Sequence, residues 1–271
     1  MENVTFNTGE THEELRNRYN PEGSVLRLAQ LRMLDMLIYL DRVCKEIGVE
    51  YVLEGGNALG AVRHGGFIPW DDDIDIDMTF DDYRKLCRYL LANPHPQYKL
   101  QTHETDPGYF GDWAVLRDLN SEYLQDSIVH NIRTYRGLQV DIFPLEKNSF
   151  YFLHRIASGL SHINEKYFVG KKRIPSIIMY HILHKFVFPL FRLIDKLNYT
   201  NNYYMYCYGH GGRVKLPENI LFPPKEIIFE GKSFLGPRNI NDYLTTFFGD
   251  YKELPPKENR HKHNASYIVR N

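Results

Sequence analysis

Polar and apolar residues alternate strictly from 73 to 78, where the chain reads Asp-Ile-Asp-Ile-Asp-Met. This period of two predicts a strand with its three apolar residues in a core and Asp73, Asp75 and Asp77 on the other face. Aspartates two residues apart on a strand lie roughly 6.6 Å apart. At that distance two charges repel by about 2.5 kcal/mol at an effective dielectric of 20. A divalent cation would reverse this repulsion, so the pattern indicates a metal site.

Hydrophobic periodicity also predicts the elements around this strand. A stripe of leucines at near-helical spacing predicts an amphipathic helix over 24–47 that packs on a core. The stretch 79–82, Thr-Phe-Asp-Asp, has the form of a capping box, so a second helix is expected over 80–91, directly after the acidic strand. Further strands are expected over 51–53, 98–102, 113–119 and 136–143.

A glycine pair, Gly55 and Gly56, follows the first of these strands and precedes a helical stretch. Two residues without a Cβ let backbone N–H groups approach a phosphate, and the helix N-terminus adds positive potential there. Asn57 comes next, and Arg63 and His64 supply cationic or hydrogen-bonding side chains beyond the first turn. A glycine pair alone is usually a turn, and an acidic run alone is usually a solvated loop. Their conjunction favours Mg²⁺-assisted phosphoryl chemistry, because Mg²⁺ binds one or two carboxylates together with phosphate oxygens.

This segment resembles the LicD family, relatives of fukutin and the fukutin-related protein within the nucleotidyltransferase-fold superfamily. The superfamily pattern is a hydrophobic residue, two small residues and a later pair of alternating acids. It is filled here by Leu53-Glu54-Gly55-Gly56 and Asp73-Ile74-Asp75-Ile76. The family's own extension of this pattern is matched from 55 to 73. Two further blocks, 137–145 and 229–260, are similar to later segments of the family.

The resemblance implies that Asp73 and Asp75 hold one or two Mg²⁺ ions, with Mn²⁺ as an alternative. It also implies that Asp141 is the third metal-binding and catalytic carboxylate. Asp77 stands where the family has glycine, and spacing alone allows either Asp73/Asp75 or Asp75/Asp77 to be the essential pair. Asp71, in the loop before the strand, is either a supporting acid or an exposed turn residue. The donor's phosphates would be bound by Gly55, Gly56, Asn57, Arg63 and His64.

The implied reaction moves a phosphorylated alcohol, phosphocholine or a similar group, from a CDP-alcohol such as CDP-choline to a hydroxyl of a cell-surface glycan or glycolipid, with release of CMP. Fukutin relatives use CDP-ribitol similarly. Choline would favour an aromatic cage, and Tyr109, Phe110 and Trp113 are candidates for it. Two alternatives stay open. One is a true nucleotidyltransferase that attacks an α-phosphate and releases pyrophosphate, and the other is a non-catalytic regulator that binds a nucleotide or a glycan.

These features predict a mixed α/β (α+β) protein with a nucleotidyltransferase-type core sheet, flanking helices, a helical insertion and a C-terminal elaboration. The expected divisions are an N-terminal helical segment 1–48, a catalytic core 49–149, a helical insertion 150–215 and a LicD-like C-terminal segment 216–271. The net charge of −1 supplies no attraction to nucleic acid. The three scattered cysteines indicate neither a disulfide framework nor a zinc site.

The polar, acidic N-terminal stretch lacks the pattern of a secretory signal, so we expect a cytoplasmic protein. The most apolar segment is 171–197, whose longest uncharged run is shorter than the approximately 20 residues needed to span a bilayer. A buried helical hairpin is the first expectation for it. A peripheral contact with the inner face of the membrane, aided by the basic run 171–173, is the alternative. His261 and His263 form a weak HxH pattern, for which a solvated tail is the expectation.

Overall fold

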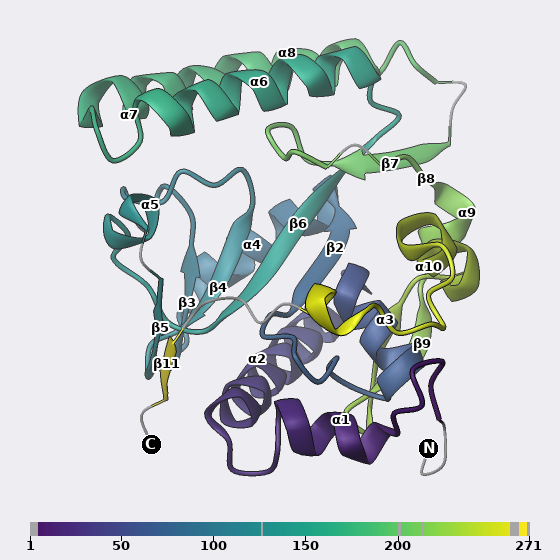
Figure 1. The fold of residues 1–271 in the computed structure, drawn as a ribbon. Coiled ribbons are helices and arrows are strands. Elements are labelled where there is room, and N and C mark those ends of the chain that lie inside the picture. Colours follow the sequence, from purple (N-terminus) through teal and green to yellow (C-terminus); the bar gives the residue numbers. More distant parts are fainter. Residues whose placement is uncertain (1–4, 126, 200–201, 213, 261–265, 270–271) are drawn as a thin grey trace.

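The computed structural model describes residues 5–125, 127–199, 202–212, 214–260 and 266–269. The predicted HxH pair lies outside these residues. Their centre is a seven-stranded sheet of order β1-β2-β6-β4-β3, extended by β7 on β6 and by β8 on β7 (Figure 1). The strands of this sheet are β1 (Val52–Leu53), β2 (Asp75–Thr79), β3 (Tyr98–Gln101), β4 (Ala114–Asp118), β6 (Gln139–Lys147), β7 (Tyr203–Tyr206) and β8 (Leu216–Pro217). All five predicted strands are present, so this part of the prediction is confirmed.

The acidic strand β2 runs parallel to β6, whereas β1, β4 and β7 run antiparallel to their neighbours. The β2–β6 register places Asp75 directly beside Asp141. The first half of β6 pairs with β4, and its last three residues pair with β7. A mixed sheet with flanking helices confirms the predicted mixed α/β class.

One face of the sheet is covered by α2 (Val25–Ile47) and α4 (Phe80–Ala92). The alternating apolar residues of β2 are fully buried, and their burial is what fixes the strand's orientation. The side chain of Thr79 accepts a hydrogen bond from the N–H of Asp82 and so caps α4. The predicted helix over 80–91 is therefore confirmed, and the aspartates of β2 are left on the opposite face.

The C-terminal segment packs beside α3 (Gly55–His64), close to β1 (Figure 1). It consists of α9 (Glu218–Leu221), β9 (Lys225–Phe229), β10 (Lys232–Gly236), α10 (Ile240–Phe248) and the short 3₁₀ turn η2 (Lys257–Asn259). The remaining small elements are α1 (His12–Tyr19), β5 (Ser121–Leu124), α5 (Ile128–Asn131) and β11 (Ser266–Val269), which pairs with β5. The C-terminal segment thus supports the helix that begins at the glycine pair.

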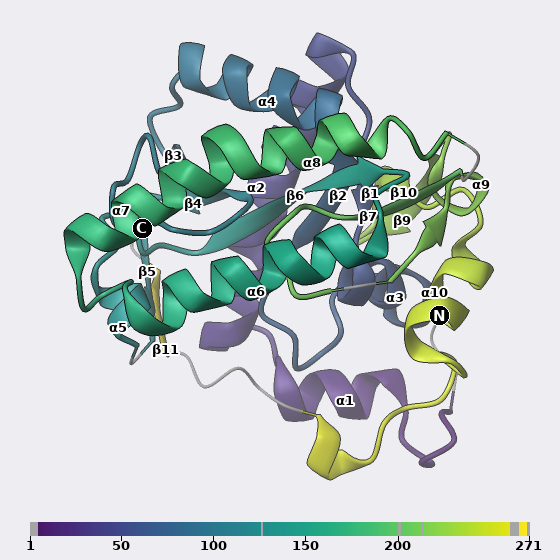
Figure 2. The ribbon, with the colours of Figure 1, turned by 90° about the horizontal axis from the view of Figure 1, so that it is seen from above.

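A helical hairpin lies across the molecule from α1 and α2 (Figure 1, and Figure 2 from above). Its first arm is α6 (Tyr151–Tyr167). Its second arm runs without a break through α7 (Arg173–Ile182), a π-helical turn η1 (Leu183–Val187) and α8 (Phe188–Asp195). The helical prediction is confirmed, but the expectation that the apolar segment is buried is wrong. The second arm meets the body along one stripe only, so many of its apolar residues are left without protein cover.

Candidate active site

The parallel pairing of β2 and β6 brings acids from distant parts of the chain together. Asp75 and Asp141 are register partners on adjacent strands, and the N–H of Asp141 donates to the carbonyl of Ile74 at 2.9 Å. Asp73 comes two residues before β2, on the same face by strand alternation. Asp73 and Asp75 are partly exposed, whereas Asp141 is buried. The sequence-predicted carboxylates are therefore gathered at one place that a ligand can reach.

These acids carry more negative charge than their surroundings balance. Burial and the neighbouring charges of Asp73 and Asp141 raise the pKa of Asp75 well above its ordinary value. Burial and Asp73 raise the pKa of Asp71 in the same way, so Asp71 belongs to the cluster rather than to an exposed turn. Such mutual repulsion favours any ligand that brings positive charge.

The carboxylate of Asp141 is held in place from both sides. The indole N–H of Trp113 donates to one oxygen at 2.9 Å, and the side-chain amide of Gln139 donates to the other at 2.5 Å. Burial raises the pKa of Asp141, and the charge of Arg117 and these hydrogen bonds act against that rise. Each oxygen keeps a further lone pair for a ligand. The side chain is thus fixed in one orientation beside Asp75.

Arg117 is a cation of this site that the sequence analysis did not identify. Its side chain is 1% exposed and donates to Gln101 at 2.7 Å and to the carbonyl of Gly137 at 2.9 Å. Burial lowers its pKa to about 10, so it stays charged at neutral pH. Arg117 lies two residues after Val115, the register partner of Asp141, and only this strand register brings it to the site.

Asp77 lies deeper than the other acids and close to Glu54, whose charge acts on Asp75 as well. Both oxygens of Asp77 are buried without a hydrogen-bond partner among the described residues, and burial and Glu54 raise its pKa. Burial raises the pKa of Glu54 to about 7, although the hydroxyl of Tyr206 donates to its carboxylate. Asp77 is thus directed toward Glu54, while Asp75 is grouped with Asp73 and Asp141.

The glycine pair shapes the N-terminus of α3 against the acidic loop. Gly55 has a φ of +38°, a left-handed value that favours glycine, and its N–H donates to the hydroxyl of Tyr243 at 3.0 Å. A Cβ on Gly56 would lie 3.0 Å from a carboxylate oxygen of Asp71. Gly56 therefore permits the close approach of α3 to the acidic loop, whereas Gly55 permits the left-handed backbone turn before it.

Asn57 ties α3 to the acidic strand. Its amide donates to the carbonyl of Asp73 at 3.0 Å, and its side-chain oxygen accepts from the N–H of Asp75 at 2.6 Å. The side chain is 2% exposed. It therefore positions the backbone of the two aspartates that are predicted to bind a metal, and these bonds use its side-chain amide and oxygen.

Arg63 and His64 lie at the other end of α3, so the structure does not bring them together with Gly55 and Gly56. Ten helical residues span about 15 Å. The Arg63 guanidinium donates to backbone carbonyls of the C-terminal segment at 3.0 and 3.2 Å. His64 is buried and packs against the rings of Phe6, His12 and Trp70.

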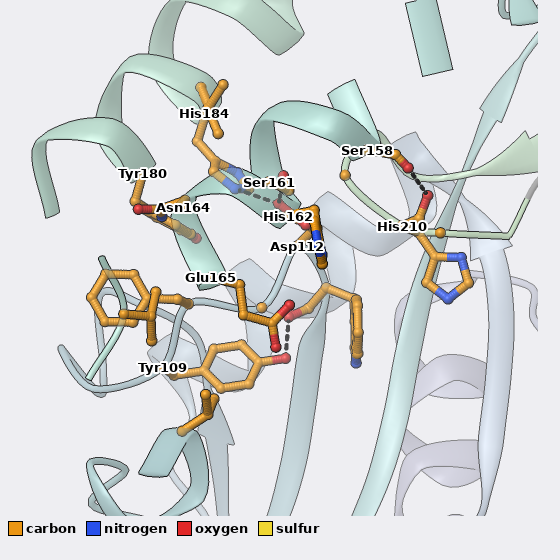
Figure 3. A pocket seen from close by; sticks show the side chains of 18 of the residues that line it. Tyr109, Asp112, Ser158, Ser161, His162, Asn164, Glu165, Tyr180, His184 and His210 are labelled. Atoms are coloured by element: carbon orange, nitrogen blue, oxygen red, sulfur yellow. Dashed lines mark hydrogen bonds and ion pairs between the residues drawn. The ribbon is translucent and has the colours of Figure 1, made fainter. Parts of the chain in front are cut away.

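Two adjoining cavities open beside the acids. The smaller has a volume of about 270 Å³ and includes Asp73, Asp141, Arg117 and Arg133 in its wall. The larger, of about 630 Å³, lies between the hairpin and the sheet (Figure 3). Both are lined by Tyr109, Trp113 and Arg133. The three aromatic residues proposed for a choline cage, Tyr109, Phe110 and Trp113, all line the larger cavity.

The larger cavity is polar on several sides (Figure 3). Asp112 accepts hydrogen bonds from His184 of the second arm at 2.9 Å and from Ser161 of α6 at 3.4 Å. The hydroxyl of Ser158 donates to the carbonyl of His210 at 3.2 Å. Donors and acceptors from the hairpin and the loop around Asp112 thus converge on a space that suits a polyhydroxylated ligand.

The donor set suits a hard divalent cation. Asp71, Asp73, Asp75 and Asp141 supply carboxylate oxygens, the ligands that Mg²⁺ and Mn²⁺ prefer. In the conformation that the described residues adopt, no three His, Cys, Asp or Glu side chains surround a common point closely enough to hold an ion. The fit therefore rests on the oxygen ligands and their uncompensated charge.

The chain is also similar to known proteins. The family model described as LicD/FKTN/FKRP, nucleotidyltransferase domain, matches residues 48–193. The chain is 28% identical to the Lipopolysaccharide cholinephosphotransferase LicD of Haemophilus influenzae over 269 residues, which cover 90% of this chain and 98% of that protein. It is 50% identical to the Ribitol 5-phosphate transferase FKRP of Homo sapiens over 44 residues, which cover 16% of this chain and 9% of FKRP. It is also 53% identical over 134 residues to the uncharacterized protein RT0683 of Rickettsia typhi, of which they cover 36%.

Proposed function

The chain belongs to the LicD/FKTN/FKRP nucleotidyltransferase family, and on that premise we propose that it transfers a phosphorylated alcohol from a CDP-alcohol to a glycan hydroxyl. Phosphocholine is the first candidate, because the relative that aligns with 98% of its own length is a cholinephosphotransferase. The observation that carries the proposal is the pairing of Asp75 with Asp141 beside a cavity that contains two arginines. This combination suits a diphosphate with its counter-ion.

Mg²⁺, or Mn²⁺ in its place, would be held by Asp73, Asp75 and Asp141. When bound, the ion would offset the negative charge of the diphosphate and of the departing CMP. Asp71 lies in the preceding loop, near enough to Asp73 for their charges to interact, and would add negative charge to this group.

The protein's own residues keep the acids and the donor in place. Asn57 holds the backbone on both sides of Ile74, and Trp113 with Gln139 fixes the Asp141 carboxylate. Arg117 is immobilised and charged, so it can balance a phosphate without a reorganisation cost. Arg133, which lines both cavities, would contact the diphosphate from the second side.

The larger cavity would hold the acceptor. Its wall shares Trp113 and Tyr109 with the donor cavity. The indole of Trp113 can bind the quaternary ammonium of choline, whereas the ring of Tyr109 is already covered by Arg133. The acceptor hydroxyl would attack the phosphorus that bears the alcohol, and the bond from that phosphorus to the bridging oxygen would break. CMP would leave with the electron pair of that bond. The hydroxyl proton would pass to the Asp141 carboxylate if Asp73 and Asp75 alone hold the ion, and to water if Asp141 is also a ligand.

The test is a panel of CDP-alcohols, CDP-choline and CDP-ribitol among them, incubated with purified protein and a soluble glycan acceptor. We expect CMP release in Mg²⁺ that is lost in EDTA and in Asp75→Asn. Release of pyrophosphate from a nucleoside triphosphate instead would identify a true nucleotidyltransferase. Nucleotide binding without either product would identify a non-catalytic binder.

A further inference from the structure

The exposed apolar residues of this molecule are concentrated on the helical hairpin. Among the described residues, 24 large hydrophobic side chains are exposed, and 13 of them lie between 151 and 199, less than a fifth of the chain. On the second arm they recur every four residues, which places them on one side of the helix. This apolar face is made by Phe152, Ile156, Ile163 and Tyr167 of the first arm and by Ile174, Ile178, Ile182, Phe186, Leu190 and Leu193 of the second.

The opposite side of the hairpin is docked on the body of the protein. Leu183, Phe188 and Phe191 pack with Leu153 and Tyr208 in a small core. The guanidinium of Arg192 forms an ion pair with Glu146 of β6 at 2.5 Å, and the hydroxyl of Tyr208 donates to Asp195 at 2.5 Å. The apolar face therefore points away from the chain's own core.

The hairpin also carries a charge opposite to that of the rest of the chain. Residues 151–199 contain eight Lys or Arg and two Asp or Glu, a net charge of +6 within a chain whose net charge is −1. All the basic residues except Arg192 are exposed. Lys171, Lys172 and Arg173 lie together where the first arm turns into the second.

We propose that the apolar face of the hairpin binds the surface of an anionic lipid bilayer, lying parallel to it, with the basic residues at the lipid phosphates. Exposed apolar residues flanked by lysine and arginine are what such a surface requires. The charge argues against a second copy as the occupant, because two hairpins that each carry a net charge of +6 would repel each other. The proposal does not depend on the transferase assignment.

A surface contact fits the structure better than a membrane span. The helix Arg173–Asp195 is long and apolar enough to cross a bilayer by length and composition. However, spanning would take the polar contacts of Arg192, His184 and Asp195 away from the body. Lying flat keeps all three, and it places the larger cavity, whose wall includes both arms, directly beneath the lipid surface.

Binding is measured by co-sedimentation of the full chain with vesicles of phosphatidylcholine alone or mixed with phosphatidylglycerol. We expect at least tenfold tighter binding to the anionic vesicles at low salt and a large loss at high salt. The triple variants Ile178/Phe186/Leu190→Gln and Lys171/Lys172/Arg173→Ser should each bind at least tenfold more weakly. Matched controls at exposed positions elsewhere, Leu28/Leu91/Phe248→Gln and Lys225/Lys232/Lys252→Ser, should bind within about twofold of wild type. These positions are exposed, and thermal melts of every variant check that the fold is kept.

Three outcomes would overturn the proposal. The first is no binding to anionic vesicles at low salt, and the second is equal loss in variants and controls. The third is a different cover for the face: a lipid-free dimer that the apolar variant dissociates, or vesicle-bound protein that resists alkaline extraction as a spanning helix does. CMP release with a soluble acceptor is measured on the same samples. Its absence would count against the transferase proposal and leave the lipid result standing.

Discussion

The acid cluster of β2 and β6 and the helical hairpin depart from the usual distribution of side chains in opposite directions. In the cluster, partly buried carboxylates lie close together and raise one another's pKa. In the hairpin, isoleucine, leucine and phenylalanine side chains face outward. Each arrangement is unfavourable in an isolated chain. On the two proposals, each would become favourable with a particular partner, a cation in one case and a lipid surface in the other.

The difference between the two regions lies in what supports them. The backbone that carries the acids is held by the strand register and by Asn57, and the side chain of Asp141 is held by its donors, so this framework is fixed before any ligand arrives. The outward face of the hairpin makes no such network with the part of the chain that the structure describes. It depends only on the helix period and on the inner stripe that docks the second arm. Binding in the first region is therefore expected to demand particular residues, and in the second only apolar and basic character.

The largest expected effect is at the acid cluster. Asp75→Asn should lower CMP release by at least about 10³-fold, because it removes a ligand and a charge at the point where Asp75 meets Asp141. The same change should leave the melting temperature in EDTA unchanged or higher, since it relieves repulsion. Thermal melts with and without Mg²⁺, beside activity assays, measure both effects. An equal Mg²⁺-induced rise in wild type and variant would contradict the assignment of Asp75 as a ligand.

The two sides of the second arm provide the next comparison. Phe188 is 1% exposed and Phe186 is 69% exposed. Phe188→Ala should cost about 3–4 kcal/mol of unfolding free energy by leaving a cavity, whereas Phe186→Ala should cost less than about 0.5 kcal/mol. Urea unfolding measures both. Similar losses from the two changes would show that the outer face is packed in solution and would remove the contrast between the regions.

Local patterns predicted one region better than the other. Strict alternation and the glycine pair located β2, α3 and the acids, because both signals lie within a few residues of the chemistry. The assignment of Asp141 to the same site as Asp73 and Asp75 followed only from the family resemblance, and its register with Asp75 was not predicted. Arg117 and Gln139 were missed because their position depends on the β4–β6 register, which joins segments more than 20 residues apart. The prediction grouped Arg63 and His64 with Gly55 and Gly56, although the two pairs lie at opposite ends of the ten-residue helix α3.

For the hairpin the helical prediction was confirmed and the burial prediction was wrong. The segment contains two apolar stripes, an inner one through Leu183 and Phe188 and an outer one through Ile182 and Phe186. Periodicity shows that a stripe exists, but it does not show whether protein or another phase covers it. The basic composition of the segment was the signal that favoured the second interpretation.

A smaller effect is expected at Glu10, an acid whose negative charge is balanced by neighbouring arginines. Burial alone would raise the pKa of Glu10, but hydrogen bonds from Arg260, Thr8 and Arg18 outweigh it and lower the pKa to about 2. The ionised form therefore stabilises the fold above pH 4.5, and this contribution is lost as the pH falls from 4.5 towards 2. Because Arg18 is exposed and screened by water, Glu10→Gln should cost only about 1–2 kcal/mol at pH 7. Urea unfolding of both proteins from pH 7 to pH 3 should show the gap narrowing below pH 4.5, and a gap that stays constant would contradict the pKa assignment.

The smallest effect is predicted for Asp77, the acid that shares the strand but not the cluster. Its buried oxygens have no hydrogen-bond partner among the described residues, and its charge faces Glu54 rather than Asp141. Asp77→Gly should remove that repulsion and keep CMP release within about tenfold of wild type, a change of about 1.4 kcal/mol or less in the barrier. Steady-state assays of this variant beside Asp75→Asn measure the difference. If both variants lose activity equally, the essential pair is Asp75/Asp77, and Asp77 belongs to the acid cluster.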